Sequence, residues 1–484
     1  MLQNGTSSLD VALRITLTTC MVVFYTLLRQ VIDGHNPGIR SPSVRFLVDT
    51  LTITTPLTFL YTIGDKHNLL WNSAIVLFVV AALILKFRLK DIKLYPPLES
   101  EYKYEKNKTY ITAFRSYVTL STIICILAVD FRAIFPGQHG KSYHFGYTLM
   151  DTGVGSFIFM AGLVAPEARM STLADTKLKI LKKSILSSSV MAVIGLLRTV
   201  ILRYMNYSVS YDEYGKDWNF FLTLASVKVL SSVVLCAFPV PQNSWILSLL
   251  IAVGYQTVLS YFGLMETLEH GVAGVTSHKD GIFNSNREGI CSSIGMLSLY
   301  FAGLSLGSLV FRKRGTLSET MKMWKIMAVL VLISWFGTWL SQNHIQEPSR
   351  CFANITYILW STAHNVSLLA LLFLMEIIFF IISHIKESSQ LPGDETVLIP
   401  GGCWNCFTKN SRNSCCCLLP AISKNQLLYF LLGNVATGMI NQIAKPHVKD
   451  YGEFSSTCFM FGYMIVVNGI ISLCFTFRWK LKFW

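Results

Sequence analysis

Long apolar stretches alternate with short polar connections along the whole chain. Most stretches have the length of a helix that crosses the hydrocarbon core of a bilayer, which needs about 20 apolar residues. The pattern predicts about thirteen such helices and therefore an all-α, polytopic integral membrane protein. They are expected at 11–31, 49–63, 69–86, 109–130, 147–165, 184–202, 219–238, 245–265, 290–311, 326–342, 353–383, 427–444 and 457–477.

Two of these stretches differ from the rest in length. The stretch 49–63 is short and rich in Thr, which is compatible with a re-entrant segment, whereas 353–383 is long enough to tilt or to extend past the membrane. No connection separates the stretches into domains, so residues 1–484 are expected to form one multi-spanning unit. The longest connection, 387–424, contains Pro-Gly turns and is expected to be a mobile cytosolic loop.

Composition supports the membrane assignment. Of the 484 residues, 52% are hydrophobic and only 14% are charged, and the mean hydropathy is +0.48. A soluble chain has about 25% charged residues. Water-soluble and intrinsically disordered proteins are therefore excluded as classes.

The net charge of +14 comes from 41 Lys and Arg residues against 27 acidic residues. Most of these basic residues lie in alternate connections, which the positive-inside rule places in the cytosol. The expected orientation has a lumenal N-terminus and a cytosolic C-terminus. The basic segment 86–110 directly adjoins predicted spans, so anionic membrane lipids are its expected partner and nucleic acid is not.

Ionisable residues inside or at the ends of apolar stretches are candidates for function, because burying a charge in lipid is costly. The densest group is Asp130, Lys141 and Asp151, around one predicted lumenal connection. A carboxylate at a membrane edge beside a cation is suited to act as a general base. The structural alternative is an interfacial salt bridge, which spacing alone does not exclude.

His364 supports a competing hypothesis. It lies in the middle of a predicted span, and membrane-bound O-acyltransferases use a lone intramembrane His as their general base. More often such a His is a hydrogen-bonded structural residue. Phosphate-loop and zinc-helix motifs do not occur. Cysteines gather at Cys403, Cys406 and 415–417, where free or S-acylated thiols are expected rather than a metal.

Several segments together resemble one family, the glycosylphosphatidylinositol (GPI) inositol acyltransferases, which comprise the class W protein of mammalian phosphatidylinositol-glycan biosynthesis and its fungal counterpart. The segments follow the family order from about residue 110 to 445. They are LAVDF (127–131), IFP (134–136), MDTGVGSF (150–157), EYGKDWNFFLTLA (213–225), NREGI (286–290), SRCFAN (349–354) and NQLLYFLLGNVATG (425–438).

The resemblance implies a multi-pass enzyme of the endoplasmic reticulum. Such enzymes move a palmitoyl group from palmitoyl-CoA, as co-substrate, to the 2-hydroxyl of inositol in glucosaminyl-phosphatidylinositol, and need no other cofactor or metal. The family's catalytic aspartate and lysine match Asp130 and Lys141, and Lys141 stays in register with Asp151. Asp130 is expected to deprotonate the hydroxyl, while Lys141 either positions and charge-balances Asp130 or stabilises the oxyanion.

Further substrate contacts are expected from polar residues in or near the matching segments: Asp151, Arg198, Asn219, Arg287 and Asn434. Two other functions remain open from the residues alone. A lipid transporter or flippase would use intramembrane charges as a path and would not depend on acyl-CoA. A His364-based acyltransferase would depend on His364 more than on Lys141.

Overall fold

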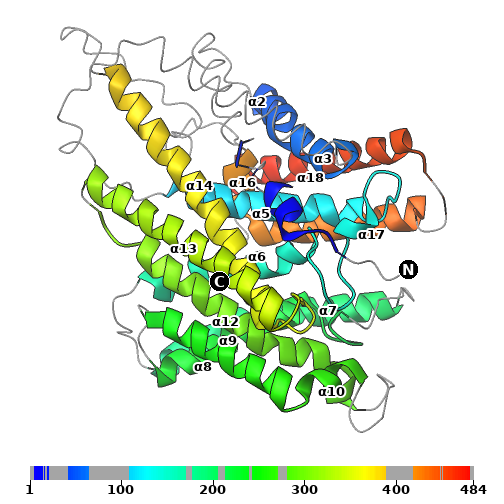
Figure 1. Cartoon of the computed structure of the whole chain (residues 1–484). Coiled ribbons are helices and arrows are strands. Elements are labelled where there is room, and N and C mark those ends of the chain that lie inside the picture. The colour runs from blue at the N-terminus through cyan, green and yellow to red at the C-terminus, as the bar shows by residue number, and fades with distance from the viewer. Residues whose placement is uncertain are drawn as a thin grey trace.

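The computed structural model describes residues 5–14, 16, 19–20, 42–64, 108–169, 177–204, 213–238, 243–270, 281–314, 316–387, 418–446, 449 and 451–479. Within these ranges the regular structure is helical, apart from an isolated antiparallel β-bridge between Thr6 and Tyr147. The helices pack side by side as a bundle (Figure 1). In chain order they are α2 (Pro42–Asp49), η1 (Thr50–Thr54), α3 (Thr55–Tyr61), α5 (Thr109–Ala128), η3 (Gly137–His139), α6 (Asp151–Leu163), η4 (Pro166–Arg169), α7 (Lys177–Tyr204), α8 (Phe220–Ala237), α9 (Ser244–Tyr261), α10 (Leu264–His270), α11 (Ile282–Ser285), α12 (Arg287–Val310), α13 (Leu317–His344), α14 (Ile355–Glu387), α16 (Leu418–Lys424), α17 (Gln426–Ala444) and α18 (Glu453–Thr476).

Nine helices in the described ranges are long and apolar enough to cross a membrane: α5, α7, α8, α9, α12, α13, α14, α17 and α18. Each coincides with a predicted stretch, so the all-helical membrane fold is confirmed. The stretch 69–86 and most of 11–31 lie outside the described residues. The count of thirteen therefore stays a prediction.

The two remaining stretches differ from their predicted lengths. The stretch 49–63 belongs to a continuous helical run, α2, η1 and α3, that begins at Pro42. The apolar pattern missed its first turns because they contain Ser43 and Arg45. The stretch 147–165 contains α6, which has only 13 residues. At 1.5 Å per residue α6 is about 20 Å long, shorter than the hydrocarbon core of a bilayer.

Close backbone contact with α12 holds α6 in the interior of the bundle (Figure 1). A Cβ atom on Gly162 would lie 2.0 Å from the carbonyl oxygen of Tyr300, and one on Gly303 would lie 2.1 Å from that of Phe159. Gly307 meets Leu163 in the same way. Gly303 and Gly307 have the spacing of small residues that let membrane helices approach closely. No larger residue fits at this crossing without separating the two helices.

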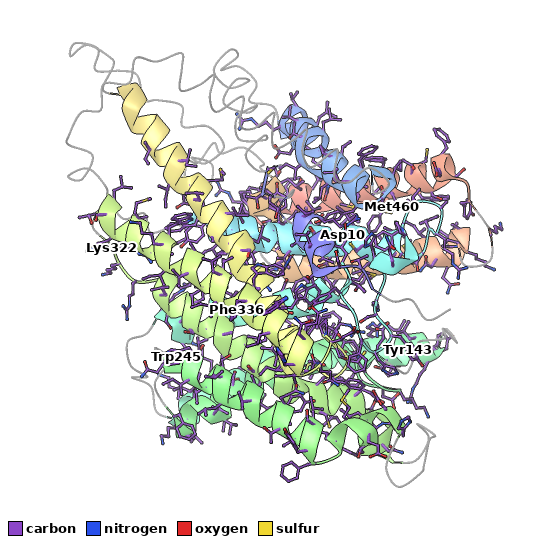
Figure 2. All side chains as sticks on the ribbon, in the orientation of Figure 1. Asp10, Tyr143, Trp245, Lys322, Phe336 and Met460 are labelled. Atoms are coloured by element: carbon purple, nitrogen blue, oxygen red, sulfur yellow. The ribbon has the colours of Figure 1, made fainter. Side chains whose placement is uncertain are left out.

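The helices differ in the surface that they expose. Residues of α5, α12 and α14 are mostly buried, whereas most residues of α7, α9 and α13 are at least partly exposed. Among the exposed side chains are Trp245 and Phe336, which project from the bundle (Figure 2). Because the exposed faces of α7, α9 and α13 are apolar, these helices are suited to contact lipid.

Segments that the charge pattern assigned to one side of the membrane also gather at one end of the bundle. Gly146 N–H donates to the carbonyl of Pro348, and Lys216 N–H donates to that of Ser285. We call this end the polar loop layer, comprising residues 130–150, 213–219, 281–289 and 345–354. At the other end, the backbone N–H of Tyr110 donates to the carboxylate of Glu376. Which end faces the cytosol stays a prediction.

The segment predicted as a mobile loop, 387–424, lies mostly outside the described residues. Its last seven residues form α16, whose residues Leu418–Ser423 are all buried. The α16 helix packs against α5 and α18. This end of the segment is therefore part of the folded bundle.

Candidate functional site

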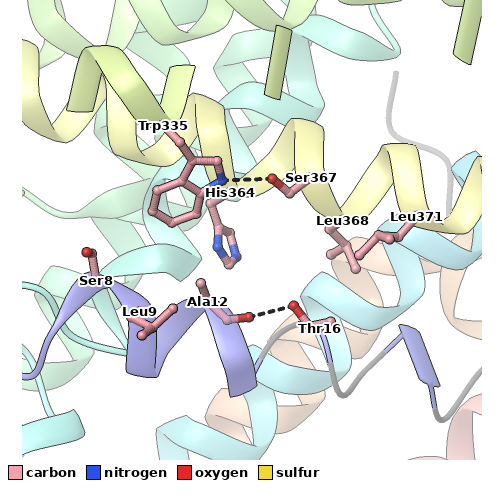
Figure 3. Close-up of a pocket in the computed structure, with 9 residues that line it drawn as sticks. All are labelled: Ser8, Leu9, Ala12, Thr16, Trp335, His364, Ser367, Leu368 and Leu371. Carbon is pink, nitrogen blue, oxygen red and sulfur yellow. Dashed lines mark hydrogen bonds between the residues drawn. The ribbon is translucent and has the colours of Figure 1, made fainter. Parts of the chain in front are cut away.

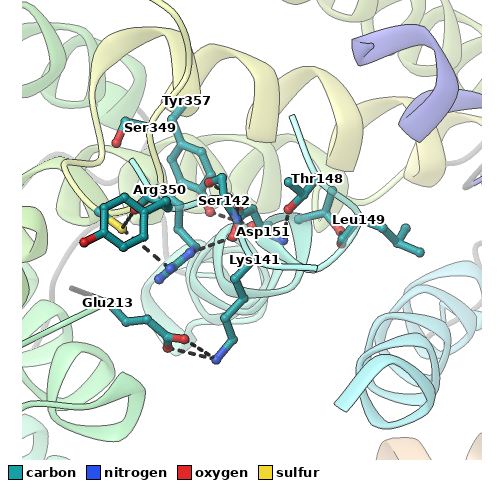
Figure 4. A network of polar contacts seen from close by, with 12 residues as sticks. Lys141, Ser142, Thr148, Leu149, Asp151, Glu213, Ser349, Arg350 and Tyr357 are labelled. Carbon is teal, nitrogen blue, oxygen red and sulfur yellow. Dashed lines mark hydrogen bonds and ion pairs between the residues drawn. The ribbon is translucent and has the colours of Figure 1, made fainter. Parts of the chain in front are cut away.

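A buried ion pair forms the centre of the polar loop layer. Arg350 Nε lies 2.7 Å from Asp151 Oδ1, and the two side chains are only 2% and 1% exposed. Asp151 is the first residue of α6, where the helix dipole favours a negative charge. Its other carboxylate oxygen accepts hydrogen bonds from the backbone N–H and the hydroxyl of Ser142 (Figure 4). Asp151 therefore ties α6 to two separate loops.

Arg350 keeps its charge despite burial. Burial alone would lower the pKa of its guanidinium, but Cys351, Asp151, Tyr214 and Glu213 raise that pKa well above its usual value. The guanidinium carbon lies 5.3 Å from the centre of the Tyr214 ring, in a cation–π arrangement. Burial raises the pKa of the Tyr214 hydroxyl to about 12, so this residue is neutral at physiological pH.

Lys141 is the second cation of the layer. Its ammonium lies 2.8 Å from both carboxylate oxygens of Glu213, and the two side chains are 46% and 25% exposed (Figure 4). Burial tends to raise the pKa of Glu213, but Lys141, Arg350 and Arg198 lower it below its usual value. Glu213 is therefore ionised at neutral pH. Among the described residues, the carboxylate paired with Lys141 is that of Glu213 and not that of Asp130.

Asp130 follows the end of α5 and is half-buried. Its Oδ2 accepts a hydrogen bond of 2.9 Å from the side-chain amide of Asn441, on the last turn of α17. The neighbouring Phe131 ring packs against Tyr451 and Phe459, near and on α18. The carboxylate predicted as the general base is thus fixed between α5 and α17.

Asp130 and Lys141 lie in one loop, residues 130–150. After Asp130 the chain passes through η3, and the backbone N–H of Met150 donates to the carbonyl of His139, which closes the turn. Leu149 and Met150, at the end of this turn, line a cavity of about 50 Å³. Its other lining residues, from α3, α5, α6 and α14, include Tyr61, Ser121, Cys125, Gly153 and His364. A largely apolar space therefore adjoins the last residues of the loop 130–150, although neither Asp130 nor Lys141 lines it.

His364 lies deeper, on α14, and is 4% exposed. It also lines a second cavity, of about 330 Å³, whose other lining residues include Ser8, Leu9, Ala12 and Thr16 (Figure 3). Neighbouring Trp335 and Ser367 are hydrogen-bonded to each other rather than to the imidazole. Among the described residues, His364 has no hydrogen-bond partner, which differs from the hydrogen-bonded structural His that the sequence favoured.

The other predicted substrate contacts are engaged in local structure. Asn219 caps α8 by accepting from Phe221 and Leu222 N–H groups. Arg287 is 2% exposed and lies 3.2 Å from Glu288. Asn434 donates a hydrogen bond to a backbone carbonyl of its own helix. Arg198 is exposed on α7, and its charge lowers the pKa of Glu213. As substrate-binding residues all four stay predictions.

Sequence reasoning did not identify Glu213 and Arg350 as partners of Lys141 and Asp151. Both lie in segments that resemble the family, EYGKDWN and SRCFAN, and this was the signal available. No group of three His, Cys, Asp or Glu residues suited to a metal occurs in the ranges that the structure describes. The cysteines at 403, 406 and 415–417 lie outside them.

Comparison with known proteins gives one consistent family. The family described as GWT1 matches residues 2–474. The chain is 31% identical over 417 residues to mouse glucosaminyl-phosphatidylinositol-acyltransferase PIGW, covering 82% of this chain and 81% of that protein. It is 29% identical over 467 residues to the human protein of the same name, covering 90% and 89%. The GPI-anchored wall transfer protein 1 of Eremothecium gossypii is 28% identical over 476 residues, covering 92% and 91%.

Proposed function

Because this chain belongs to the GWT1 family, we propose that it is a membrane acyltransferase of GPI-anchor biosynthesis. Its acceptor is the 2-hydroxyl of inositol in glucosaminyl-phosphatidylinositol, and its donor is palmitoyl-CoA. The names of the mouse and human relatives support glucosaminyl-phosphatidylinositol as the acceptor lipid and the transfer of an acyl group, but do not name the hydroxyl. The endoplasmic reticulum membrane is the proposed location, with the polar loop layer toward the lumen.

The observation that carries this proposal is the loop 130–150, which begins with the Asp130 carboxylate, carries the Lys141 ammonium and ends at residues that line a largely apolar cavity. Acyl transfer to an alcohol needs a base for the hydroxyl proton and positive charge at the carbonyl oxygen. It also needs an apolar space for the fatty chain. Asp130 and Lys141 supply the first two elements, and the two cavities lined by His364, of about 330 and 50 Å³, supply apolar space for part of the chain.

In the proposed reaction, Asp130 accepts the proton of the inositol hydroxyl as the hydroxyl oxygen attacks the thioester carbonyl carbon. The negative charge that develops on the carbonyl oxygen is stabilised by Lys141. When the tetrahedral intermediate collapses, the carbon–sulfur bond breaks and the CoA thiolate takes the proton back from Asp130. The products are an inositol ester and free CoA, and Asp130 returns to its ionised state.

The test is incubation of the purified protein with radiolabelled palmitoyl-CoA and glucosaminyl-phosphatidylinositol. We expect a labelled, acylated inositol lipid from the wild-type protein and none from a folded D130N variant. If the folded wild-type protein forms no labelled product with both substrates present, the acyltransferase proposal is overturned. A D130N variant with the wild-type rate would overturn only the assignment of the base.

A second candidate places the general base at His364. The observation that favours it is the imidazole between two cavities, with no hydrogen-bond partner among the described residues. This alternative requires H364A to reduce acyl transfer more than K141A does. A lipid flippase, the remaining alternative, would move the glycolipid without acyl-CoA and would form no labelled product.

A further inference from the structure

We propose that Glu213 is a positioning residue that holds the Lys141 ammonium in place for acyl transfer, and that the segment 213–219 is folded to present it. This inference rests on the proposed role of Lys141. Glu213 acts through Lys141 and does not itself touch the reacting atoms. It lies 72 residues from Lys141 in the sequence, so the contact depends on the folded loop layer.

Glu213 contacts the Lys141 ammonium through both of its carboxylate oxygens. Both carboxylate oxygens of Glu213 lie 2.8 Å from Lys141 Nζ. A lysine side chain has four rotatable carbon bonds, and an exposed lysine samples many rotamers. Lys141 is 46% exposed, so neighbouring side chains do little to restrict it. The carboxylate of Glu213 is therefore the main group that fixes the ammonium.

The backbone beside Lys141 is fixed independently. The next residue, Ser142, donates both its N–H and its hydroxyl to Asp151, and Asp151 is paired with Arg350. One end of the lysine is thus anchored through its backbone and the other through its ammonium. Loss of Glu213 would release the ammonium while leaving the backbone anchor intact.

Glu213 is fixed in turn by the way its segment docks on the start of α12. Asn286 Oδ1 accepts from the backbone N–H groups of Asp217 and Trp218, at 2.8 and 2.9 Å. Lys216 N–H donates to the carbonyl of Ser285 at 2.8 Å. These bonds hold the three residues that follow Gly215 against the Ser285 carbonyl and the Asn286 side chain.

Two glycines make this docking sterically feasible. Gly215 has φ +102°, and a Cβ atom there would lie 2.5 Å from Asn286 Cα. A Cβ atom on Gly289 would lie 2.2 Å from the Trp218 ring. Only glycine fits at either position without displacing the segment. The EYGKDWN and NREGI segments therefore form a single support for Glu213.

The charge of Glu213 is secured by its surroundings. Although burial opposes ionisation, Lys141, Arg350 and Arg198 together lower its pKa. Arg350 also stacks on the ring of Tyr214, the next residue, which orients the start of the segment. A charged and oriented carboxylate is what a positioning role for an ammonium requires.

The test compares E213Q and E213D with the wild type and with D217N. Gln keeps the shape of Glu213 and removes its charge, whereas Asp keeps the charge on a shorter stem. Asp217 lies in the same segment and pairs with Arg203 at an exposed site, so D217N is the matched control. The readouts are kcat, KM for each substrate, and the melting temperature of the purified protein.

We expect E213Q to lower kcat by about 10- to 100-fold, the scale of a misplaced catalytic group, with KM nearly unchanged. E213D should recover part of that loss, and D217N should match the wild type. In addition, K141A/E213Q should be no less active than K141A, because Glu213 acts only through Lys141. A structural role would instead make the double variant worse.

The outcomes separate this inference from the proposed function. A folded E213Q variant with wild-type kcat, beside an inactive K141A variant, would overturn the positioning role and leave the role of Lys141 standing. A fully active K141A variant would overturn the role of Lys141 itself. If E213Q does not fold, E213D decides: a kcat equal to that of D217N would overturn the inference.

Discussion

The polar loop layer and the membrane interior around His364 differ in whether their polar side chains have partners. In the loop layer, Asp151 and Lys141 each have an oppositely charged partner at 2.7 or 2.8 Å. In the interior, His364 lies between two cavities without a hydrogen-bond partner among the described residues. An unpaired charge is costly in an apolar environment, whereas a neutral imidazole is tolerated there.

In the proposed reaction, this difference would separate the reacting groups in the loop layer from the space for the acyl chain in the interior. The groups proposed to carry charge during acyl transfer, Asp130 and Lys141, both lie in the loop layer, where Asn441 and Glu213 are their partners. The interior contains two cavities lined by His364, of about 330 Å³ and about 50 Å³. We therefore expect substitutions in the loop layer to affect catalysis and stability strongly, and substitutions in the interior to affect mainly chain accommodation.

The largest expected effect is on turnover. D130N and K141A should each lower kcat by about 100- to 10,000-fold, the usual contribution of a positioned proton-transfer or charge-stabilising group. Steady-state acyl transfer with purified variants measures this. Equal losses in H364A would break the comparison, because the interior would then carry the chemistry.

Next in size is the stability effect of the buried ion pair. R350M should destabilise the protein by about 3–5 kcal/mol, because it leaves Asp151 buried without its cation. R203M, which breaks an exposed pair with Asp217, should cost less than about 1 kcal/mol and is the control. Thermal unfolding in matched detergent gives both values. Similar melting temperatures for the two variants would contradict the structural role of Arg350.

The tight crossing of α6 and α12 gives the corresponding test in the interior. G303A should destabilise the protein by about 1–3 kcal/mol, because its Cβ would overlap the carbonyl of Phe159. G438A is the control, since a Cβ atom there meets no atom within 4 Å. Equal melting temperatures of the two variants would show that the crossing is looser than described.

A smaller effect is expected from filling the space beside His364. H364L should change kcat with palmitoyl-CoA by less than about tenfold, or 1.4 kcal/mol. It should alter the relative rates with shorter and longer acyl-CoA donors, because the imidazole lines both cavities. Acyl-chain profiles of H364L and the wild type measure this. Identical profiles would mean that the chain does not reach His364.

The smallest expected effect is the acid dependence of the Lys141–Glu213 pair. Because the folded protein lowers the pKa of Glu213, the pair stabilises the fold above the usual Glu pKa, about 4.3. This contribution is lost as the pH falls through the lowered pKa. The melting-temperature difference between wild type and E213Q should stay constant from pH 7 to 5 and shrink below pH 4. A difference that vanishes already at pH 6 would contradict the lowered pKa.

Hydropathy predicted most of the fold because each spanning helix is a local apolar pattern. It overestimated α6, since residues 147–150 are apolar enough to extend the stretch but fold as part of the loop. The placement of ionisable residues singled out Asp130, Lys141 and Asp151, and the resemblance added the expected catalytic roles of Asp130 and Lys141. The partners of Lys141 and Asp151 could not be predicted from the sequence. Glu213 lies 72 residues from Lys141 and Arg350 lies 199 residues from Asp151, so each pair meets only through tertiary packing.

The Asp151–Arg350 pair also has a consequence for how the chain is made. The two residues are 199 positions apart. At a synthesis rate of about 5–20 residues per second, the carboxylate of Asp151 is translated about 10–40 s before its cation. During that interval α6 cannot settle into its final place beside α14 with Asp151 charged and buried. Assembly of the central helix must therefore wait for the C-terminal third of the chain, and a nascent chain that stops before residue 350 exposes an unpaired acidic group to the machinery of membrane-protein quality control.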